Sequence, residues 1–277
     1  MIRVHQSVSD PGRKGRANED MAGAAGRFAW IIDGATGLGE RQLIDSAPSD
    51  AAWLSATLHI AMEEAAERMD NPLDLLTHAA AEAERQFVDA CDRAPEERYE
   101  IPTAAVLVAR FGDDGVETVD LGDCAIYLAA GGEIARFGGT EHGRALEQEN
   151  ARRTMGTGSG RTPEVQEMLR TIRNKANTPD GYSIIAPSAD SARPARRHRH
   201  PAPAGDALLL TDGFEAAIED YALHTPASLI EAARSGLGAP LAALRDVERS
   251  DPDCTRFPRF KPSDDATALF LTYGGGR

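Results

Sequence analysis

The chain has few of the residues that a disulfide-linked or zinc-binding scaffold requires. Its 277 residues include three cysteines, Cys91, Cys124 and Cys254, which lie far apart and form no Cys-x-x-Cys pair. This spacing argues against a disulfide framework and against a zinc knuckle. A chain of this length can bury a sizeable core without such links. Its 42% hydrophobic and 27% charged residues are ordinary for a globular protein.

Long hydrophobic runs are also missing. The longest purely apolar stretch is the six residues Ala104–Ala109, far short of the roughly 20 residues that a transmembrane helix needs. The first residues, Met1 to Gln6, lack the apolar centre of a signal peptide. From the sequence we therefore expect a cytoplasmic protein without a membrane span.

Positive charge is scarce as well, since 30 Lys and Arg residues stand against 44 Asp and Glu residues and give a net charge of −14. A surface this negative repels phosphate backbones and anionic lipid headgroups. The composition therefore predicts that neither nucleic acid nor a membrane surface is a partner.

Hydrophobic periodicity predicts a mixture of helices and antiparallel strands. A pair of amphipathic helices is expected over 51–69 and 73–91, the second after the helix-starting pair Asn71-Pro72. Further helices are expected over 163–175 and 226–233. Short apolar runs predict strands over 28–33, 103–111, 116–121, 125–130, 133–137, 206–211 and 267–273. Because tight turns join the strands between 103 and 137, we expect that block to be an antiparallel meander.

The whole chain, 1–277, is expected to form one domain with an irregular, mobile, flap-like insertion around 138–204. This region contains the basic run Arg193–His200. We interpret the run as a solvated loop in preference to a binding patch for an acidic or phosphorylated partner.

Acidic residues recur at the ends of the predicted strands. Asp33-Gly34 and Asp212-Gly213 each follow an apolar strand, Asp123 follows Leu121-Gly122, Asp264-Asp265 precedes the last strand, and Glu19-Asp20 precedes the first. A single acid at a strand end is usually a turn former. Five such clusters beside buried strands would bring carboxylates together, and these repel one another unless a positive charge lies between them.

A pair of Mg²⁺ or Mn²⁺ ions would neutralise such a cluster, because these ions prefer carboxylate, carbonyl and water oxygens. Two metals can activate a water molecule between them for attack on a phosphoryl group. Arg16, just before the acidic pair at 19 and 20, would suit a bidentate grip on phosphate.

Five motifs occur in a recognisable order, and they are Arg16-Ala-Asn-Glu-Asp20, Asp33-Gly-Ala-Thr-Gly37, Leu121-Gly-Asp123, Leu210-Thr-Asp-Gly-Phe214 and Asp264-Asp-Ala-Thr267. Together they resemble the metal-dependent serine/threonine phosphatases of the PP2C type, the PPM family. The resemblance runs from about Arg16 to the last strand. It implies an α+β fold with four α-β-β-α layers, in which two antiparallel β-sheets are flanked by helices and a dinuclear metal site lies at one edge.

The resemblance also assigns roles to residues. Asp33 would bridge two Mn²⁺ or Mg²⁺ ions and Gly34 would offer its carbonyl to one of them. Asp212 and Asp264 would hold the other ion. The acidic pair Glu19 and Asp20 would bind the second ion directly or through water, Asp123 would serve a possible third ion, and Arg16 would grip the substrate phosphate, with Arg13 or Lys14 as substitutes.

Two departures from the family pattern bear on activity. Many members have histidine where this chain has Ala35, so the general acid would be a metal-bound water or would be absent. Ala216 stands where the family often has an aspartate that helps the third ion, which makes third-ion binding doubtful.

The sequence thus leaves three functional hypotheses. The first is a phosphatase that hydrolyses phosphoserine or phosphothreonine in proteins with a metal-activated water, acting as a monomer. The second is a pseudo-phosphatase that binds a phosphorylated partner without turnover, and the third is a phosphatase of small phosphate esters.

Overall fold

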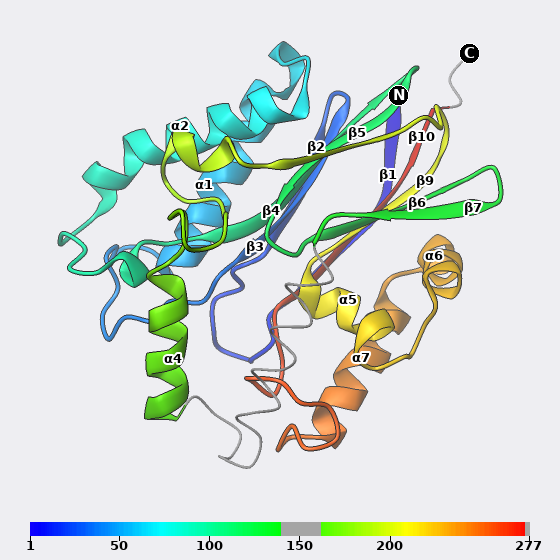
Figure 1. Cartoon of the computed structure of the whole chain (residues 1–277). Helices are drawn as coiled ribbons and strands as arrows, with labels where there is room; N and C mark the ends of the chain where they lie inside the picture. Colours follow the sequence, from blue (N-terminus) through cyan, green and yellow to red (C-terminus); the bar gives the residue numbers. More distant parts are fainter. Residues whose placement is uncertain (140–161, 275–277) are drawn as a thin grey trace.

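The computed structural model describes residues 1–139 and 162–274 (Figure 1). The strands are β1 (Ile2–Asp10), β2 (Met21–Ala25), β3 (Phe28–Gly34), β4 (Ala104–Gly112), β5 (Gly115–Leu121), β6 (Ala125–Ala130), β7 (Glu133–Phe137), β8 (Arg196–His200), β9 (Gly205–Leu210) and β10 (Ala266–Tyr273). The helices are α1 (Asp50–Ala65), α2 (Pro72–Ala90), α4 (Pro163–Arg173), α5 (Asp212–Glu219), α6 (Pro226–Ser235) and α7 (Gly238–Ser250). Short 3-10 helices lie at Ala66–Arg68, Arg98–Glu100 and Ala189–Ala192.

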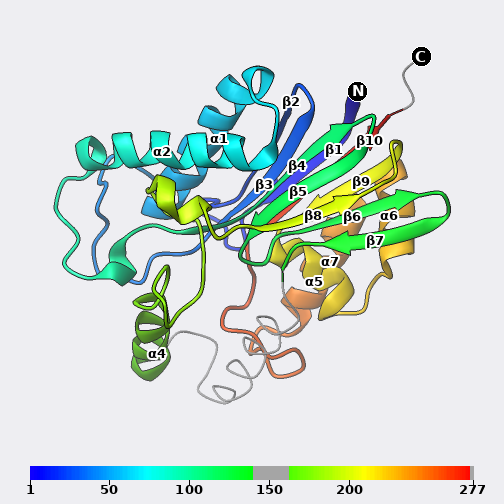
Figure 2. The ribbon, with the colours of Figure 1, turned by 45° about the horizontal axis from the view of Figure 1, so that its top comes forward.

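The strands form two antiparallel sheets packed face to face. One sheet has the order β1-β10-β9-β6-β7 and the other has the order β2-β3-β4-β5-β8. Helices α1 and α2 lie across the outer face of the second sheet, and α5, α6 and α7 lie against the first (Figures 1 and 2). The fold is therefore the four-layer α-β-β-α sandwich that the sequence motifs implied.

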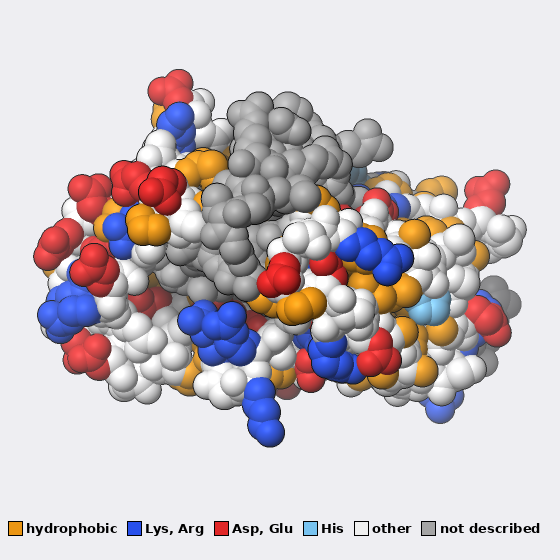
Figure 3. All heavy atoms as spheres, turned by 90° about the horizontal axis from the view of Figure 1, so that it is seen from below, with side chains coloured by type: hydrophobic (Ala, Val, Ile, Leu, Met, Phe, Trp, Pro, Cys, Tyr) orange, Lys and Arg blue, Asp and Glu red, His pale blue; other side chains and the backbone are white. Residues whose placement is uncertain are grey.

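The exterior carries charge of both signs. On the face seen from below in Figure 3, acidic and basic side chains of the described residues are interspersed. None of the helices in the two described ranges is both long enough and apolar enough to cross a membrane.

Strand β3 shows how the layers are built from the sequence. Its side chains alternate between the two faces of the sheet, and Phe28, Trp30 and Ile32 join the core beneath α1 and α2, whereas Ala29 and Ile31 join the core between the sheets. All five are fully buried. A strand covered on both faces needs a continuous apolar run, which is why this segment has one.

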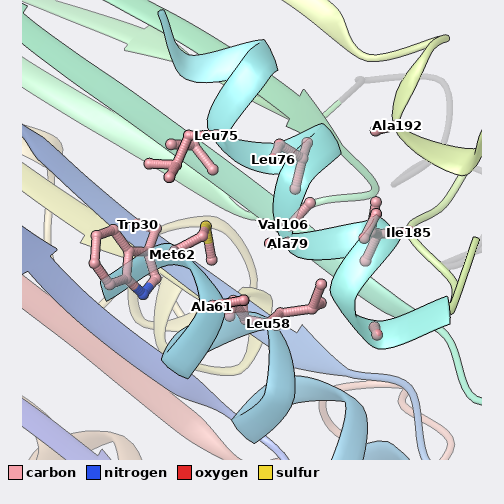
Figure 4. Packing of buried hydrophobic residues seen from close by; sticks show 14 of the residues in the cluster. Trp30, Leu58, Ala61, Met62, Leu75, Leu76, Ala79, Val106, Ile185 and Ala192 are labelled. Atoms are coloured by element: carbon pink, nitrogen blue, oxygen red, sulfur yellow. The ribbon is translucent and has the colours of Figure 1, made fainter. Parts of the chain in front are cut away.

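The core beneath the helix pair draws on both helices and the sheet. Leu58 and Met62 of α1, Leu76 of α2 and Trp30 of β3 belong to one cluster of buried hydrophobic residues (Figure 4). Each helix begins at a side-chain cap, because the Oγ of Ser49 accepts from the amide of Ala52 and the side chain of Asn71 accepts from the amide of Asp74. A third core lies between the other sheet and α5 to α7, with Phe214 at 0% exposure.

Most of the strands and helices expected from periodicity are confirmed, but the meander is wrong. Strands β4 and β5 form a hairpin in one sheet, while β6 and β7 form a hairpin in the other. The chain changes sheets at Gly122-Asp123-Cys124, between β5 and β6. Gly122 has a φ of 84°, a backbone conformation that glycine adopts without strain. A tight link between strands therefore need not join neighbours in one sheet.

The interpretation of the basic run as a solvated loop is also wrong. Arg196–His200 is β8, the edge strand that pairs with β5. Its Arg196 forms an ion pair with Asp120, a fully buried carboxylate that also lies 3.2 Å from His198 Nε2. The buried counter-charge makes a basic strand compatible with this edge. The part of the expected insertion at 140–161 lies outside the described residues.

Strands β1 and β2 and helices α5 and α7 were not expected. β1 is an edge strand with the polar sequence Ile-Arg-Val-His-Gln-Ser-Val-Ser-Asp, and most of its side chains are exposed. An edge strand buries little, so its hydrophobic pattern is weak.

Candidate metal centre

Three acidic residues meet at one end of the sheet that contains β3. Asp33 is opposite Ala105 of β4, and Asp20 directly precedes Met21, whose partner is Ile32. Asp123 lies two residues beyond Leu121, which pairs with Val106. The strand register thus brings Asp20, Asp33 and Asp123 to the same end of the sheet.

Two further acids come from the other sheet. Asp212 begins α5 just after β9, and Asp264 lies just before β10. Because Leu210 pairs with Ala268, the end of β9 and the start of β10 are neighbours, as Figure 1 shows near the lower centre of the view. A Cβ at Gly213 would lie 3.1 Å from the Cβ of Asp264, so the two segments touch.

The electrostatics show that the two groups form one cluster. Burial raises the pKa of Asp33 well above its usual range, and the charges of Asp212, Asp20, Asp123 and Asp264 raise it further. Burial and the charge of Asp264 likewise raise the pKa of Asp20 from 3.8 to about 8. Carboxylates from five distant parts of the sequence thus influence one another, and their role as metal ligands stays a prediction.

The donor atoms suit a hard divalent cation. Oδ2 of the buried Asp20 accepts a hydrogen bond from Thr211 Oγ1 at 2.9 Å, while its Oδ1 is buried without a hydrogen-bond partner. Carboxylate oxygens are the ligands that Mg²⁺ and Mn²⁺ prefer. Within residues 1–139 and 162–274, however, no three Asp, Glu, His or Cys side chains surround one point as a ready-made ion site. The oxygen donors of these residues fit such a cation in chemistry.

A basic side chain, which no sequence motif indicated, lies against these acids. The ammonium of Lys261 forms an ion pair with Asp264 Oδ1. Burial lowers the pKa of Lys261, but the charges of Asp264, Asp212 and Asp33 outweigh that effect and raise it above the ordinary value. Lys261 therefore supplies one positive charge to the acidic cluster.

Glu19 does not point toward the other acids. Its Oε2 accepts a hydrogen bond from Thr36 Oγ1 and its Oε1 accepts one from Ser49 Oγ, both at 2.6 Å. Ser49 is also the residue that caps α1. The Glu19 carboxylate thus links the loop after β3 to the start of α1, and its role as a metal ligand stays a prediction.

Gly34 allows the ends of β2 and β3 to approach closely. Its amide donates to the carbonyl oxygen of Glu19 at 3.1 Å. A Cβ at this position would lie only 2.5 Å from that same oxygen and 2.9 Å from Ser55 Oγ. A larger residue would force the two segments apart, so a glycine is required here.

Asp265 has a positioning role that the motifs did not reveal. Its Oδ1 accepts from the amide of Gly12 at 2.9 Å, and its Oδ2 accepts from the amide of Glu19 at 2.7 Å. One carboxylate therefore fixes the loop after β1 and the start of β2 against the start of β10. The signal in the sequence was only its place beside Asp264.

Arg16 is exposed on the loop between β1 and β2. Its amide donates to the carbonyl of Arg13 at 3.1 Å, and its guanidinium makes no ion pair or hydrogen bond to any described side chain. Arg16 is thus close to the acidic pair Glu19-Asp20 along the chain, but none of these contacts connects its side chain to the acidic cluster. Asp123 is also exposed, at the mouth of the cluster.

Comparison with known families agrees with this architecture. The sequence model of the family described as protein phosphatase 2C matches residues 13–235, which is most of the chain. The chain belongs to the protein phosphatase 2C family. No curated protein sequence matches it.

Solved structures of protein phosphatases share the fold. The Mycobacterium tuberculosis serine/threonine phosphatase PstP/Ppp is 14% identical, with a TM-score of 0.59 and 99% of each chain covered. The photosystem II phosphatase PBCP is also 14% identical, with a TM-score of 0.56 and 99% of each chain covered. A catalytic domain of PstP in complex with two manganese ions gives a TM-score of 0.51 at 14% identity over 99% of each chain. Identities this low show a common fold.

Proposed function

We propose that this member of the protein phosphatase 2C family hydrolyses phosphoserine and phosphothreonine in proteins, using two Mn²⁺ or Mg²⁺ ions. The observation that carries the proposal is the convergence of Asp20, Asp33, Asp123, Asp212 and Asp264 at one end of both sheets. The family match and the manganese-bound PstP structure support it.

We assign the residues that would hold the ions by the resemblance of the motifs to those of the family. Asp33, whose pKa the other acids raise, would bridge the two ions, and Asp212 and Asp264 would hold one of them. Gly34, Asp20 and Glu19 would serve the second ion, directly or through water. When bound, the ions supply a nucleophilic water of lowered pKa and stabilise charge on the phosphoryl oxygens.

Other side chains orient this set. Thr211 Oγ1 donates to Asp20 Oδ2 and accepts from the amide of Thr267 at 3.0 Å, which connects the acid to the start of strand β10. Arg16, exposed on the loop between β1 and β2, would bind the substrate phosphate through its guanidinium. Ala35 carries no acidic proton, so no side chain at that position protonates the leaving alcohol.

The substrate and setting extend the proposal. A phosphorylated protein is the substrate class, because similar structures are serine/threonine phosphatases by name. We further propose a single domain over 1–277, a monomeric state and a cytoplasmic location, with neither nucleic acid nor a membrane as partner.

A direct assay tests the proposal. Purified protein is incubated with Mn²⁺ and either phosphoserine and phosphothreonine peptides or p-nitrophenyl phosphate. Asp33→Asn is compared with the wild type, and Asp70→Asn, whose side chain is 91% exposed, is the matched control. We expect metal-dependent turnover of the peptides that Asp33→Asn abolishes and Asp70→Asn preserves.

Each other outcome has a clear meaning. Phosphopeptide binding without turnover would favour the pseudo-phosphatase. Turnover confined to p-nitrophenyl phosphate would favour a phosphatase of small phosphate esters. Equal turnover by Asp33→Asn and the wild type would contradict the proposed site altogether.

A further inference from the structure

Lys261 is the feature of the acidic cluster that the proposed function does not use. Its ammonium contacts the carboxylate of Asp264, and its side chain keeps 36% of its surface exposed while that of Asp264 keeps 32%. The charges that act on it most strongly come from Asp264, Asp212 and Asp33. Asp212 and Asp264 are assigned above to one metal ion and Asp33 to both, so all three would hold that ion.

The ammonium therefore contacts one of the residues that would hold that metal ion and lies within the electrostatic influence of the other two. An ammonium is a compact point charge on a flexible stem, and a cation close to a second cation raises the free energy of both. A divalent ion held by Asp33, Asp212 and Asp264 must either displace Lys261 from Asp264 or bind against its repulsion. Both alternatives weaken metal binding.

The backbone around Lys261 is anchored, so the exchange needs only a side-chain movement. Asp251 accepts hydrogen bonds from the amides of Thr255, Arg256 and Phe257 at 3.0 to 3.1 Å. Arg259 pairs with Asp251 at 2.7 Å and donates from Nε to the carbonyl of Pro262 at 3.0 Å. These contacts fix the loop on both sides of position 261.

We propose that Lys261 is a tethered counter-ion of the metal centre, which compensates the clustered carboxylates in the metal-free protein and competes with a divalent cation for Asp264. The inference rests on the proposed metal-dependent function and adds a residue that sets the metal affinity.

Metal titration tests this role without relying on catalysis. Mn²⁺ is titrated calorimetrically into metal-free wild-type protein and into Lys261→Met, Lys261→Gln and Lys261→Arg at one pH and ionic strength. Lys175→Met is the matched control, since Lys175 is an exposed lysine just after α4 and its loss changes the net charge equally. Thermal unfolding of each protein is measured with EDTA and with Mn²⁺.

We expect Lys261→Met and Lys261→Gln to bind Mn²⁺ about ten-fold more tightly or better, equivalent to roughly 1.4 kcal/mol. Lys261→Arg, which keeps the charge, and Lys175→Met should stay within two-fold of the wild type. The neutral variants should also unfold at a lower temperature than the wild type in EDTA and show a larger rise on addition of Mn²⁺.

Unchanged or weaker Mn²⁺ binding by both neutral variants would overturn the inference. If the wild type still binds Mn²⁺ and Asp33→Asn does not, the proposed function survives that failure. If the wild type and both neutral variants all fail to bind Mn²⁺, the proposed function falls together with the inference.

Discussion

In the metal-free protein the free energy of unfolding should fall as the pH rises from 5 to 8, because the carboxyl group of Asp20 is buried. Its side chain is 3% exposed and its pKa is raised from 3.8 to about 8, first by burial and then by the charge of Asp264. Between these two values the folded protein holds a proton that the unfolded chain has released. Stability is therefore greatest below pH 3.8 as far as this group is concerned and is lost as the pH rises toward 8.

The size of the effect follows from the shift. A displacement of about four pKa units corresponds to roughly 5 kcal/mol between the limits, at 1.36 kcal/mol per unit. Between pH 5 and pH 8 the loss from Asp20 is about 4 kcal/mol. Asp33, whose pKa is also raised, adds a loss of the same sign.

Urea unfolding in EDTA at several values between pH 5 and pH 8 measures this loss. Asp20→Asn should flatten the dependence, Asp70→Asn should leave it as in the wild type, and saturating Mn²⁺ should suppress it. A metal-free wild type that gains stability over this range would refute the reasoning, as would an Asp20→Asn variant with the same slope as the wild type.

Three further predictions concern the surroundings of the site. Glu215 is buried and pairs with Arg136 at 2.8 Å, so Glu215→Ala should lower the free energy of unfolding in urea by about 3–5 kcal/mol. Glu231→Ala, at an exposed position, should lower it by less than about 1 kcal/mol. Equal losses of stability in the two variants would contradict the pairing. Gly34→Ala, with its Cβ 2.5 Å from the Glu19 carbonyl oxygen, should cost about 1–3 kcal/mol, and an unchanged unfolding midpoint would show that the contact is absent. Cys124, 1% exposed and with its thiol pKa raised by burial and by Asp33, should react with a thiol reagent only on unfolding; rapid modification of the native protein would place it at the surface.

The sequence was informative where a strand is buried on both faces and ends in an acid. Strand β3 satisfies both conditions, and its run Phe-Ala-Trp-Ile-Ile before Asp33 predicted a strand that the structure confirms. The role of Asp33 as a metal ligand stays a prediction. The register of antiparallel strands then brings Asp20 and Asp123 to the same place. The central acids of the cluster were therefore predictable from local pattern and motif order.

The contributions that come only from tertiary contact were not predictable. In the sequence Lys261 has no feature that distinguishes it from a surface lysine. Its contact with Asp264 depends on the conformation of the loop 251–262. Likewise, β8 reads as a solvated basic segment because its counter-charge, Asp120, is 76 residues away in sequence. Local sequence patterns indicate which apolar side chains are buried. They do not indicate which charged side chains form ion pairs with distant segments of the chain.

The basic edge strand β8 has a consequence for self-association. An outer strand exposes unpaired backbone amides and carbonyls, onto which a second chain can add its own strand and begin to aggregate. Arg197 and Arg199 are exposed along this border. A second molecule aligned there would face these guanidinium groups with its own, and the repulsion discourages continuous sheets from growing between molecules.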